Sequence, residues 1–422
     1  MHKSYTLISL LLFNLAFHSF AQPQQAIYFK GAIKNKKEAL QRNILNTINK
    51  NLSLPLNEET EENWMDAFGA MEILRYNSPW ADGKINVAFE GIENRSLYFQ
   101  RALLELIYTN YPDQFVKQAT ALMKSTIDAK IYAMCAEYLL QTKNSQLSFD
   151  NVKIKAQQLV QDQKSEAIIH QLLNRIKNRE KAVNCISLKE TTRPDFLKQH
   201  RILYSFQRKN RNYPGLAVIR DSTGNFVKDS SGNVFSVPQL ARSISNLPGY
   251  LTNGNTPQGI FRMYGFDTSK STFIGPTTNI QLTMPFETSL QHFFNDSTIT
   301  DSIWTEDWFK KLLPKNLKNC APVFESYYAG MAGRTEIIAH GTTVNPEYYK
   351  GRSYYPQTPT MGCLCTKEIW DETDGKRSES DQQKLVAALI EAGGPNGYCV
   401  VVEIDDEQKP VSIQDILPWI KQ

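Results

Sequence analysis

Residues 337–342 read Ile-Ile-Ala-His-Gly-Thr, and residues 360–363 read Thr-Met-Gly-Cys. The first stretch is a short apolar run, which predicts a strand that ends at His340. The second stretch follows a loop and ends at Cys363. A cysteine is a good acyl acceptor only as a thiolate, and a histidine is a natural base for removing its proton. The two stretches therefore predict a nucleophile, Cys363, and a base, His340.

The small residues of these motifs fit the same chemistry. Gly362 would let the backbone pass close to a substrate carbonyl, and backbone N–H groups around Cys363 would stabilise an oxyanion. Thr360 and Gly341 complete the two motifs. No grouping of His, Cys and carboxylate residues has the spacing of a zinc site. We therefore expect neither a metal nor an organic cofactor.

The chain around the motifs, residues 195–422, has the pattern of a mostly β domain. Two similar turn sequences, 221–225 and 229–233, predict consecutive hairpins with Gly at a positive φ. Apolar runs predict the strands, and helical periodicity predicts two helices. The predicted strands are 216–219, 226–227, 234–235, 260–264, 336–339 and 398–404, and the predicted helices are 300–313 and 382–392.

Residues 22–190 have a different pattern, that of short amphipathic helices. Apolar residues recur at helical spacing in four runs, over 64–71, 115–123, 131–138 and 168–176. Such helices would pack as a bundle or as an irregular solenoid. The sequence therefore predicts a multidomain α + β protein, in which an all-α helical domain of unknown role precedes a mostly β catalytic domain.

Residues 1–21 have the pattern of a secretory signal peptide. A basic start is followed by an apolar core over 6–17, which is too short to span a bilayer, and then by the small residues Ser19 and Ala21. No later stretch is long and apolar enough for a membrane span. We expect an exported mature chain without a membrane span, located in the periplasm or cell envelope.

Composition and charge narrow the class of protein further. The 422 residues are 41% hydrophobic and 21% charged, which is close to the globular average and excludes bulk disorder. Lys+Arg 47 against Asp+Glu 43 gives a net charge of +4, with the two signs interspersed. Charge therefore gives no support to a nucleic-acid partner.

All six cysteines follow the predicted signal peptide, and an exported compartment permits disulfides. An even count would allow three bridges, and one option is a bridge between Cys320 and Cys399. Cys363 and Cys365 could instead form a redox pair or a resting disulfide, although they lack the Cys-x-x-Cys spacing of thioredoxin-like sites. The sequence leaves these alternatives open.

The motifs resemble those of the YkuD-type L,D-transpeptidase family of bacterial cell-wall enzymes. His340-Gly341 matches the family's His-Gly at a strand end, and Thr360-x-Gly362-Cys363 matches its Ser/Thr-x-Gly-Cys. Upstream, residues 256–261 have the family's Thr-Pro-x-Gly-x-Phe form. The resemblance extends over roughly residues 200–405 and implies an L,D-transpeptidase-like catalytic domain.

The resemblance implies that Cys363 attacks the amide between the L- and D-centres of a peptidoglycan stem peptide and forms a thioester, with His340 as the base. The acceptor is then an amine of another stem, for cross-linking, or water, for an L,D-carboxypeptidase. Arg334 and Arg352 would meet a stem carboxylate, although flanking arginines are most simply surface residues. Tyr355 and its neighbouring tyrosines either line a substrate groove or pack the loop.

The sequence departs from the family pattern at two positions. Met361 stands where many members have a second histidine, and Cys365 stands where Arg or Asn is common. These departures motivate an alternative in which the β half is a non-catalytic peptidoglycan-binding module. A further hypothesis makes the helical half an interaction scaffold for another envelope protein. It predicts that deletion of residues 22–190 abolishes function in cells but spares chemistry on isolated muropeptides.

Overall fold

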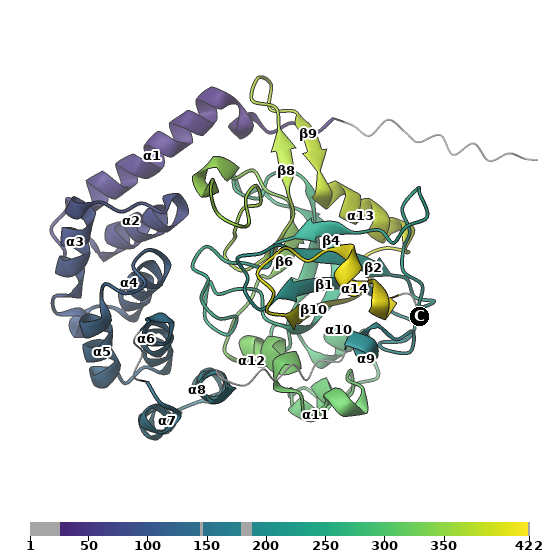
Figure 1. The fold of residues 1–422 in the computed structure, drawn as a ribbon. Coiled ribbons are helices and arrows are strands. Elements are labelled where there is room, and N and C mark those ends of the chain that lie inside the picture. The colour runs from purple at the N-terminus through teal and green to yellow at the C-terminus, as the bar shows by residue number, and fades with distance from the viewer. Residues whose placement is uncertain (1–25, 144–146, 179–187, 421–422) are drawn as a thin grey trace, which may run out of the picture.

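The computed structural model describes residues 26–143, 147–178 and 188–420 (Figure 1). The predicted signal peptide, residues 1–21, and Cys185 lie outside these ranges. Within the described ranges, no helix combines the length and the apolar character that a membrane crossing requires.

The N-terminal half is helical, as predicted, and its helices follow one another along an arc beside the sheet (Figure 1). The four predicted runs lie in α2, α5, α6 and α8, and their apolar faces share one core cluster. Side chains of Ser78, Ser96, Asp128 and Ser148 accept a backbone N–H at four helix starts, which satisfies donors that the helix leaves free. The helices are α1 Lys34–Leu52, α2 Glu61–Leu74, α3 Pro79–Phe89, α4 Leu97–Asn110, α5 Val116–Ser125, α6 Ala129–Gln141, α7 Phe149–Gln158 and α8 Gln163–Asn178.

The C-terminal half is built on an eight-stranded mixed sheet of order β3-β2-β1-β10-β4-β5-β6-β7. Pairs β1–β10 and β6–β7 are parallel, and the other neighbours are antiparallel. A bridge between Leu240 and Cys365 connects the two ends, so the sheet is nearly closed. Its strands are β1 Arg201–Arg208, β2 Gly215–Arg220, β3 Val237–Gln239, β4 Gly259–Thr268, β5 Thr278–Thr283, β6 Ile338–His340, β7 Leu364–Cys365 and β10 Gly397–Asp405.

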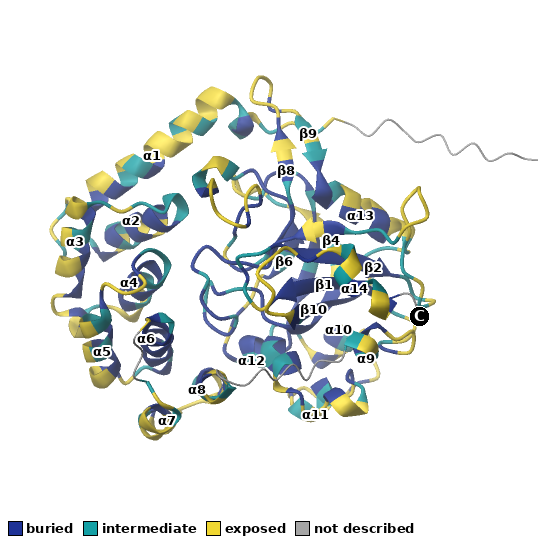
Figure 2. Cartoon of the chain, in the orientation of Figure 1, coloured by how far each residue is buried: buried dark blue, intermediate teal, exposed yellow. Residues whose placement is uncertain are grey.

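Both faces of this sheet are covered, which explains the continuous apolar runs of its central strands. Figure 2 shows these strands almost entirely buried, whereas α1 is largely exposed. One face packs against α10, α12 and α14, and α13 covers the other. The other α-helices are α9 Leu188–Thr192, α10 Leu290–Phe294, α11 Glu306–Lys310, α12 Glu325–Met331, α13 Asp381–Glu391 and α14 Ile413–Ile420. A separate hairpin consists of β8 Glu368–Trp370 and β9 Arg377–Ser380.

Several local predictions need correction. Residues 226–227 and 234–235 form only isolated bridges, although both turns with Gly at positive φ are present. The helix expected over 300–313 is limited to α11. Glu336 adopts a left-handed φ of 62°, so β6 begins only at Ile338. Short segments such as these take their conformation from tertiary contacts rather than from local pattern.

The cysteine predictions are also corrected. Cys135, Cys363, Cys365 and Cys399 are free, so neither three bridges nor a Cys320–Cys399 bridge exists. Cys320 is disulfide-bonded. Cys399 points into the apolar core under the sheet, where burial raises the pKa of its thiol and leaves it unreactive.

The N-terminal segment before α1 pairs with the far end of the chain. The Phe29 amide donates to the Gly375 carbonyl at 2.9 Å, and the Lys34 amide donates to the Glu372 carbonyl at 2.9 Å. The Phe29 ring lies 5.9 Å from the ring of Trp370. The hairpin β8–β9 is therefore bound to the start of the helical arc, as Figure 1 shows.

Candidate active site

The site lies where β6 and β7 run side by side in parallel. Their register pairs Ala339 with Leu364 and His340 with Cys365. Cys363 immediately precedes β7, two residues before the register partner of His340. The parallel pairing therefore brings the segment that carries Cys363 next to the strand that ends at His340.

His340 is buried, with 3% of its surface exposed. Its Nδ1 hydrogen-bonds with the Gly341 carbonyl, so Nδ1 carries the proton and Nε2 is the free acceptor. Burial lowers the pKa of His340 from 6.5 to about 4. At neutral pH the ring is therefore uncharged, which is the state in which it accepts a proton.

Cys363 is half-buried, and its Sγ donates to the Glu336 carbonyl at 3.5 Å. Burial raises the pKa of its thiol, and the charge of Arg334 partly opposes that shift. Glu336 itself is held in its left-handed conformation by Glu287, whose Oε1 accepts the Glu336 amide at 2.7 Å. A resting neutral thiol needs a base at the moment of attack, and the neutral imidazole of His340 is the candidate for that base.

The turn that carries the cysteine is fixed from both sides. Thr360 Oγ1 donates to the Cys363 carbonyl at 3.0 Å and accepts the Gly362 amide at 3.0 Å. Thr256 Oγ1 donates to the Gly362 carbonyl at 2.8 Å, which gives the upstream Thr-Pro motif a structural role. Because the Gly362 amide is already bonded to Thr360, it is not a free donor for an oxyanion. The roles of Thr360 and Gly362 are to shape the turn.

Position 341 must be a glycine because a carboxylate that the motifs do not predict lies against it. A Cβ at Gly341 would collide with the Glu368 carboxylate. Glu368 is buried under the motif and accepts from Thr277 Oγ1 at 2.7 Å, Ser380 Oγ at 2.6 Å and the Thr342 amide at 3.1 Å. Glu368 therefore anchors the chain just after His340. Nothing in the local sequence distinguishes it, because its partners come from three distant segments.

The two candidate arginines have different environments. Arg334 is buried, with 6% of its surface exposed, so the expectation that it is a surface residue is wrong. Its guanidinium donates to carbonyls of Gly249, Gly254 and Asn255, and these bonds engage it with the protein rather than with solvent. Arg352 is exposed. Of the two, Arg352 alone is free to meet a substrate carboxylate.

The tyrosines of the loop after His340 divide into two groups. Tyr349 and Tyr354 are buried and pack with Leu240 in a small apolar cluster. These two rings pack the loop, which answers the alternative that the sequence left open for them. Tyr355 is 39% exposed, and its hydroxyl donates to Glu347 at 2.8 Å. Tyr355 is therefore the tyrosine of this loop that is most open to a ligand.

Cys365, the register partner of His340, is fully buried, and burial raises the pKa of its thiol to about 12. It is free, as is Cys363. A thiol of this kind is a poor nucleophile at neutral pH. The geometry therefore favours Cys363 as the reactive thiol and gives no support to a disulfide between the two.

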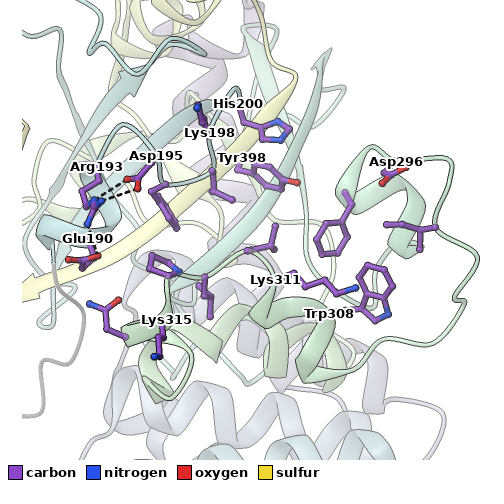
Figure 3. Close-up of a pocket in the computed structure, with 18 of the residues that line it drawn as sticks. Glu190, Arg193, Asp195, Lys198, His200, Asp296, Trp308, Lys311, Lys315 and Tyr398 are labelled. Carbon is purple, nitrogen blue, oxygen red and sulfur yellow. Dashed lines mark hydrogen bonds and ion pairs between the residues drawn. The ribbon is translucent and has the colours of Figure 1, made fainter.

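A hollow of about 1360 Å³ lies elsewhere on the β half, between the segment 193–200 and the segment 294–316 (Figure 3). Its described lining contains neither Cys363 nor His340. The charged groups at its rim are partly paired, as Arg193 with Asp195 at 2.9 Å. This hollow is therefore not the place of the predicted chemistry.

Among the described residues, no group of three or more His, Cys, Asp or Glu side chains is arranged to hold a metal ion. No protein-family model, no curated protein and no solved structure matches the chain. The function is therefore argued from the geometry of the site and from the motifs.

Proposed function

We propose that this protein is a peptidoglycan-remodelling cysteine L,D-transpeptidase, which cross-links stem peptides through a thioester on Cys363. The observation that supports the proposal is the parallel pairing of β6 and β7, which brings the segment of Cys363 next to the strand that ends at His340. The resemblance of the two motifs to the YkuD-type family supplies the substrate class.

Acylation begins with transfer of the Cys363 thiol proton to Nε2 of His340. The sulfur attacks the carbonyl carbon of the amide between the L- and D-centres, and the C–N bond of the tetrahedral intermediate then breaks. The imidazolium returns the proton to the leaving amine of the terminal D-residue. The bond between Nδ1 and the Gly341 carbonyl keeps the ring oriented throughout these steps.

Deacylation repeats the same steps with a new nucleophile. His340 takes a proton from the amine of a second stem peptide as that amine attacks the thioester, and the Cys363 thiolate leaves and recovers the proton. With water in place of the amine, the same residues would act as a carboxypeptidase. Arg352 and Tyr355 are the exposed side chains that we assign to stem-peptide contacts. No cofactor takes part in the proposed steps.

The proposal also includes the place of action. The signal-peptide pattern of residues 1–21 supports export to the periplasm or cell envelope, where the substrate lies. Peptidoglycan stem peptides are the proposed partners, and the helical half is free to bind another envelope protein.

The test uses the purified mature protein with disaccharide-tetrapeptide muropeptides and mass spectrometry under reducing conditions. We expect a cross-linked dimer, and we expect Cys363→Ala to lower its formation by at least about 10³-fold because the covalent route is lost. Cys365→Ala is the matched control, since it removes a buried thiol two residues away and should leave turnover near the wild-type rate.

The products discriminate between the alternatives. Tripeptide without dimer would replace transpeptidation by carboxypeptidation on the same residues. No product with reduced wild-type protein, or equal turnover by Cys363→Ala, would contradict the proposal and favour a binding module.

A further inference from the structure

The segment 244–256 belongs to the β half by sequence but is shared by both halves. Leu247, Tyr250 and Leu251 are at most 3% exposed and lie in the same apolar cluster as the core of the helical arc. Their burial against the helices fixes the segment from the helical side.

Buried carboxylates of the helical half bind the polar groups of this segment. Glu105 on α4 accepts from Asn253 Nδ2 at 3.1 Å, and Glu137 on α6 accepts from the Tyr250 hydroxyl at 2.9 Å. Both carboxylates are at most 4% exposed, and burial raises the pKa of the Glu105 carboxyl to about 7. Two further bonds, from Lys130 Nζ to Thr252 Oγ1 and from Arg75 Nη2 to the Ile244 carbonyl, hold the same segment.

The other side of the segment faces the nucleophile. The carbonyls of Gly249, Gly254 and Asn255 accept from the Arg334 guanidinium, at 2.8 Å for Asn255 and 3.0 Å for Gly254. Arg334 in turn lies directly against Gly362, where an added Cβ would collide with its Nη2 and approach the Gly254 carbonyl to 2.5 Å. The segment and Arg334 therefore form the wall behind the turn that carries the cysteine.

The contacts thus form a continuous chain from the helical half to the thiol. Glu105 holds Asn253, the segment presents its carbonyls to Arg334, and Arg334 lies behind Gly362, next to Cys363. The charge of Arg334 also opposes the burial that raises the pKa of the Cys363 thiol. If Arg334 lost its carbonyl partners, its guanidinium would move away from the turn. The turn would then lose its support behind Gly362, and the Cys363 thiol would lose the positive charge that lowers its pKa.

We propose that the helical half is part of the catalytic centre, with Glu105 as a positioning residue that holds Arg334 and the turn 360–363 in place through the segment 244–256. The inference rests on the proposed function in one respect, that Cys363 is the reacting thiol. It assigns a role to the helical half, for which the sequence motifs predict no chemistry.

The test compares Glu105→Ala with Glu105→Gln in the full mature chain. The readout is the rate of alkylation of Cys363 by iodoacetamide as a function of pH, mapped by mass spectrometry. We expect Glu105→Ala to slow alkylation at neutral pH by about three- to tenfold and to shift its profile to higher pH. Glu105→Gln keeps an oxygen that accepts from Asn253, so it should restore most of the rate.

Glu61→Ala is the matched control. Glu61 is also a buried carboxylate of the helical half, but it bonds to Ser96 at 2.6 Å and pairs with Arg95 at 3.7 Å within that half. It should lower stability without changing the alkylation profile. If Glu105→Ala does not fold, Asn253→Ala removes the same bond from the segment side.

Equal alkylation rates and profiles in the wild type and in the folded variant that lacks the Glu105–Asn253 bond would overturn the inference. The failure of the proposed function is distinguishable from this outcome. A reactive Cys363 that depends on Glu105, in a protein that does not convert muropeptides, would uphold the inference and reject the substrate.

Discussion

Gly362 combines a positive φ with close neighbours. Its φ is 120°, and the Gly254 carbonyl and Arg334 leave no room for a side chain. We expect Gly362→Ala to lower the free energy of unfolding by about 1–3 kcal/mol and to abolish most of the activity, because the turn must move away from Arg334. Urea unfolding and muropeptide turnover measure the two effects.

Gly351→Ala provides the comparison. Gly351 also has a positive φ, 84°, but no atom lies within 4 Å of the position that a Cβ would take there. Its substitution should cost only the backbone strain and leave activity close to that of the wild type. Equal activity losses at the two glycines would show that strain alone matters and that the contact with Arg334 does not.

The pKa of His340 predicts an acid-sensitive fold. The pKa is lowered from 6.5 to about 4 by burial, so the unfolded chain binds this proton first as the pH falls. The contribution of neutral His340 to the free energy of unfolding is fully present above pH 6.5. As the pH falls from 6.5 to 4, this contribution is lost, and the free energy of unfolding falls by up to about 3 kcal/mol. His340→Asn stays neutral and retains a donor for Gly341, so its free energy of unfolding should fall less in this range.

Urea unfolding of both proteins across this pH range is the measurement. The exposed His292→Asn variant is the control and should follow the wild type. Parallel pH dependences of the wild type and His340→Asn would mean that His340 is not the group that carries the effect.

At the residue scale, the sequence predicts Cys363, His340 and Gly362 because each follows from local chemistry. The burial of Arg334 was not predictable, since its partners are carbonyls of Gly249, Gly254 and Asn255, about which the local sequence says nothing. Every residue has a backbone carbonyl, so the sequence cannot indicate which carbonyls a buried arginine will bind.

At the scale of elements, periodicity predicts the long features and misses the short ones. The amphipathic runs of α2, α5, α6 and α8 and the apolar run of β10 confirm their predictions, because burial of a whole face requires the pattern. β7, only two residues long, exists through its pairing with β6. The local sequence therefore could not predict β7, the strand that follows Cys363.

At the scale of the whole molecule, the two halves are joined by a shared core, and we expect them to unfold together. Leu251→Ala should lower the free energy of unfolding by about 2–5 kcal/mol, because this fully buried side chain lies in the cluster that both halves contribute to. Hydrogen exchange with mass spectrometry should show faster exchange in α4 and α6 and in β6 and β7 alike.

An effect of Leu251→Ala confined to the helices would contradict the shared core.

The shared core also opposes the hypothesis that chemistry survives deletion of residues 22–190. That deletion would expose Leu247, Tyr250 and Leu251 and remove the partners of the segment 244–256. We expect the shortened chain to lose muropeptide turnover as well as function in cells.

The pairing of the N-terminal segment with the hairpin β8–β9 has a consequence for the order in which the chain folds. Lys37 and Glu372, which form an ion pair at this junction, are 335 positions apart. The first helix leaves the ribosome long before its partner exists, and closing so long a loop is entropically costly and slow. The start of α1 therefore lacks its contacts with the hairpin β8–β9 until nearly the entire polypeptide has been synthesised.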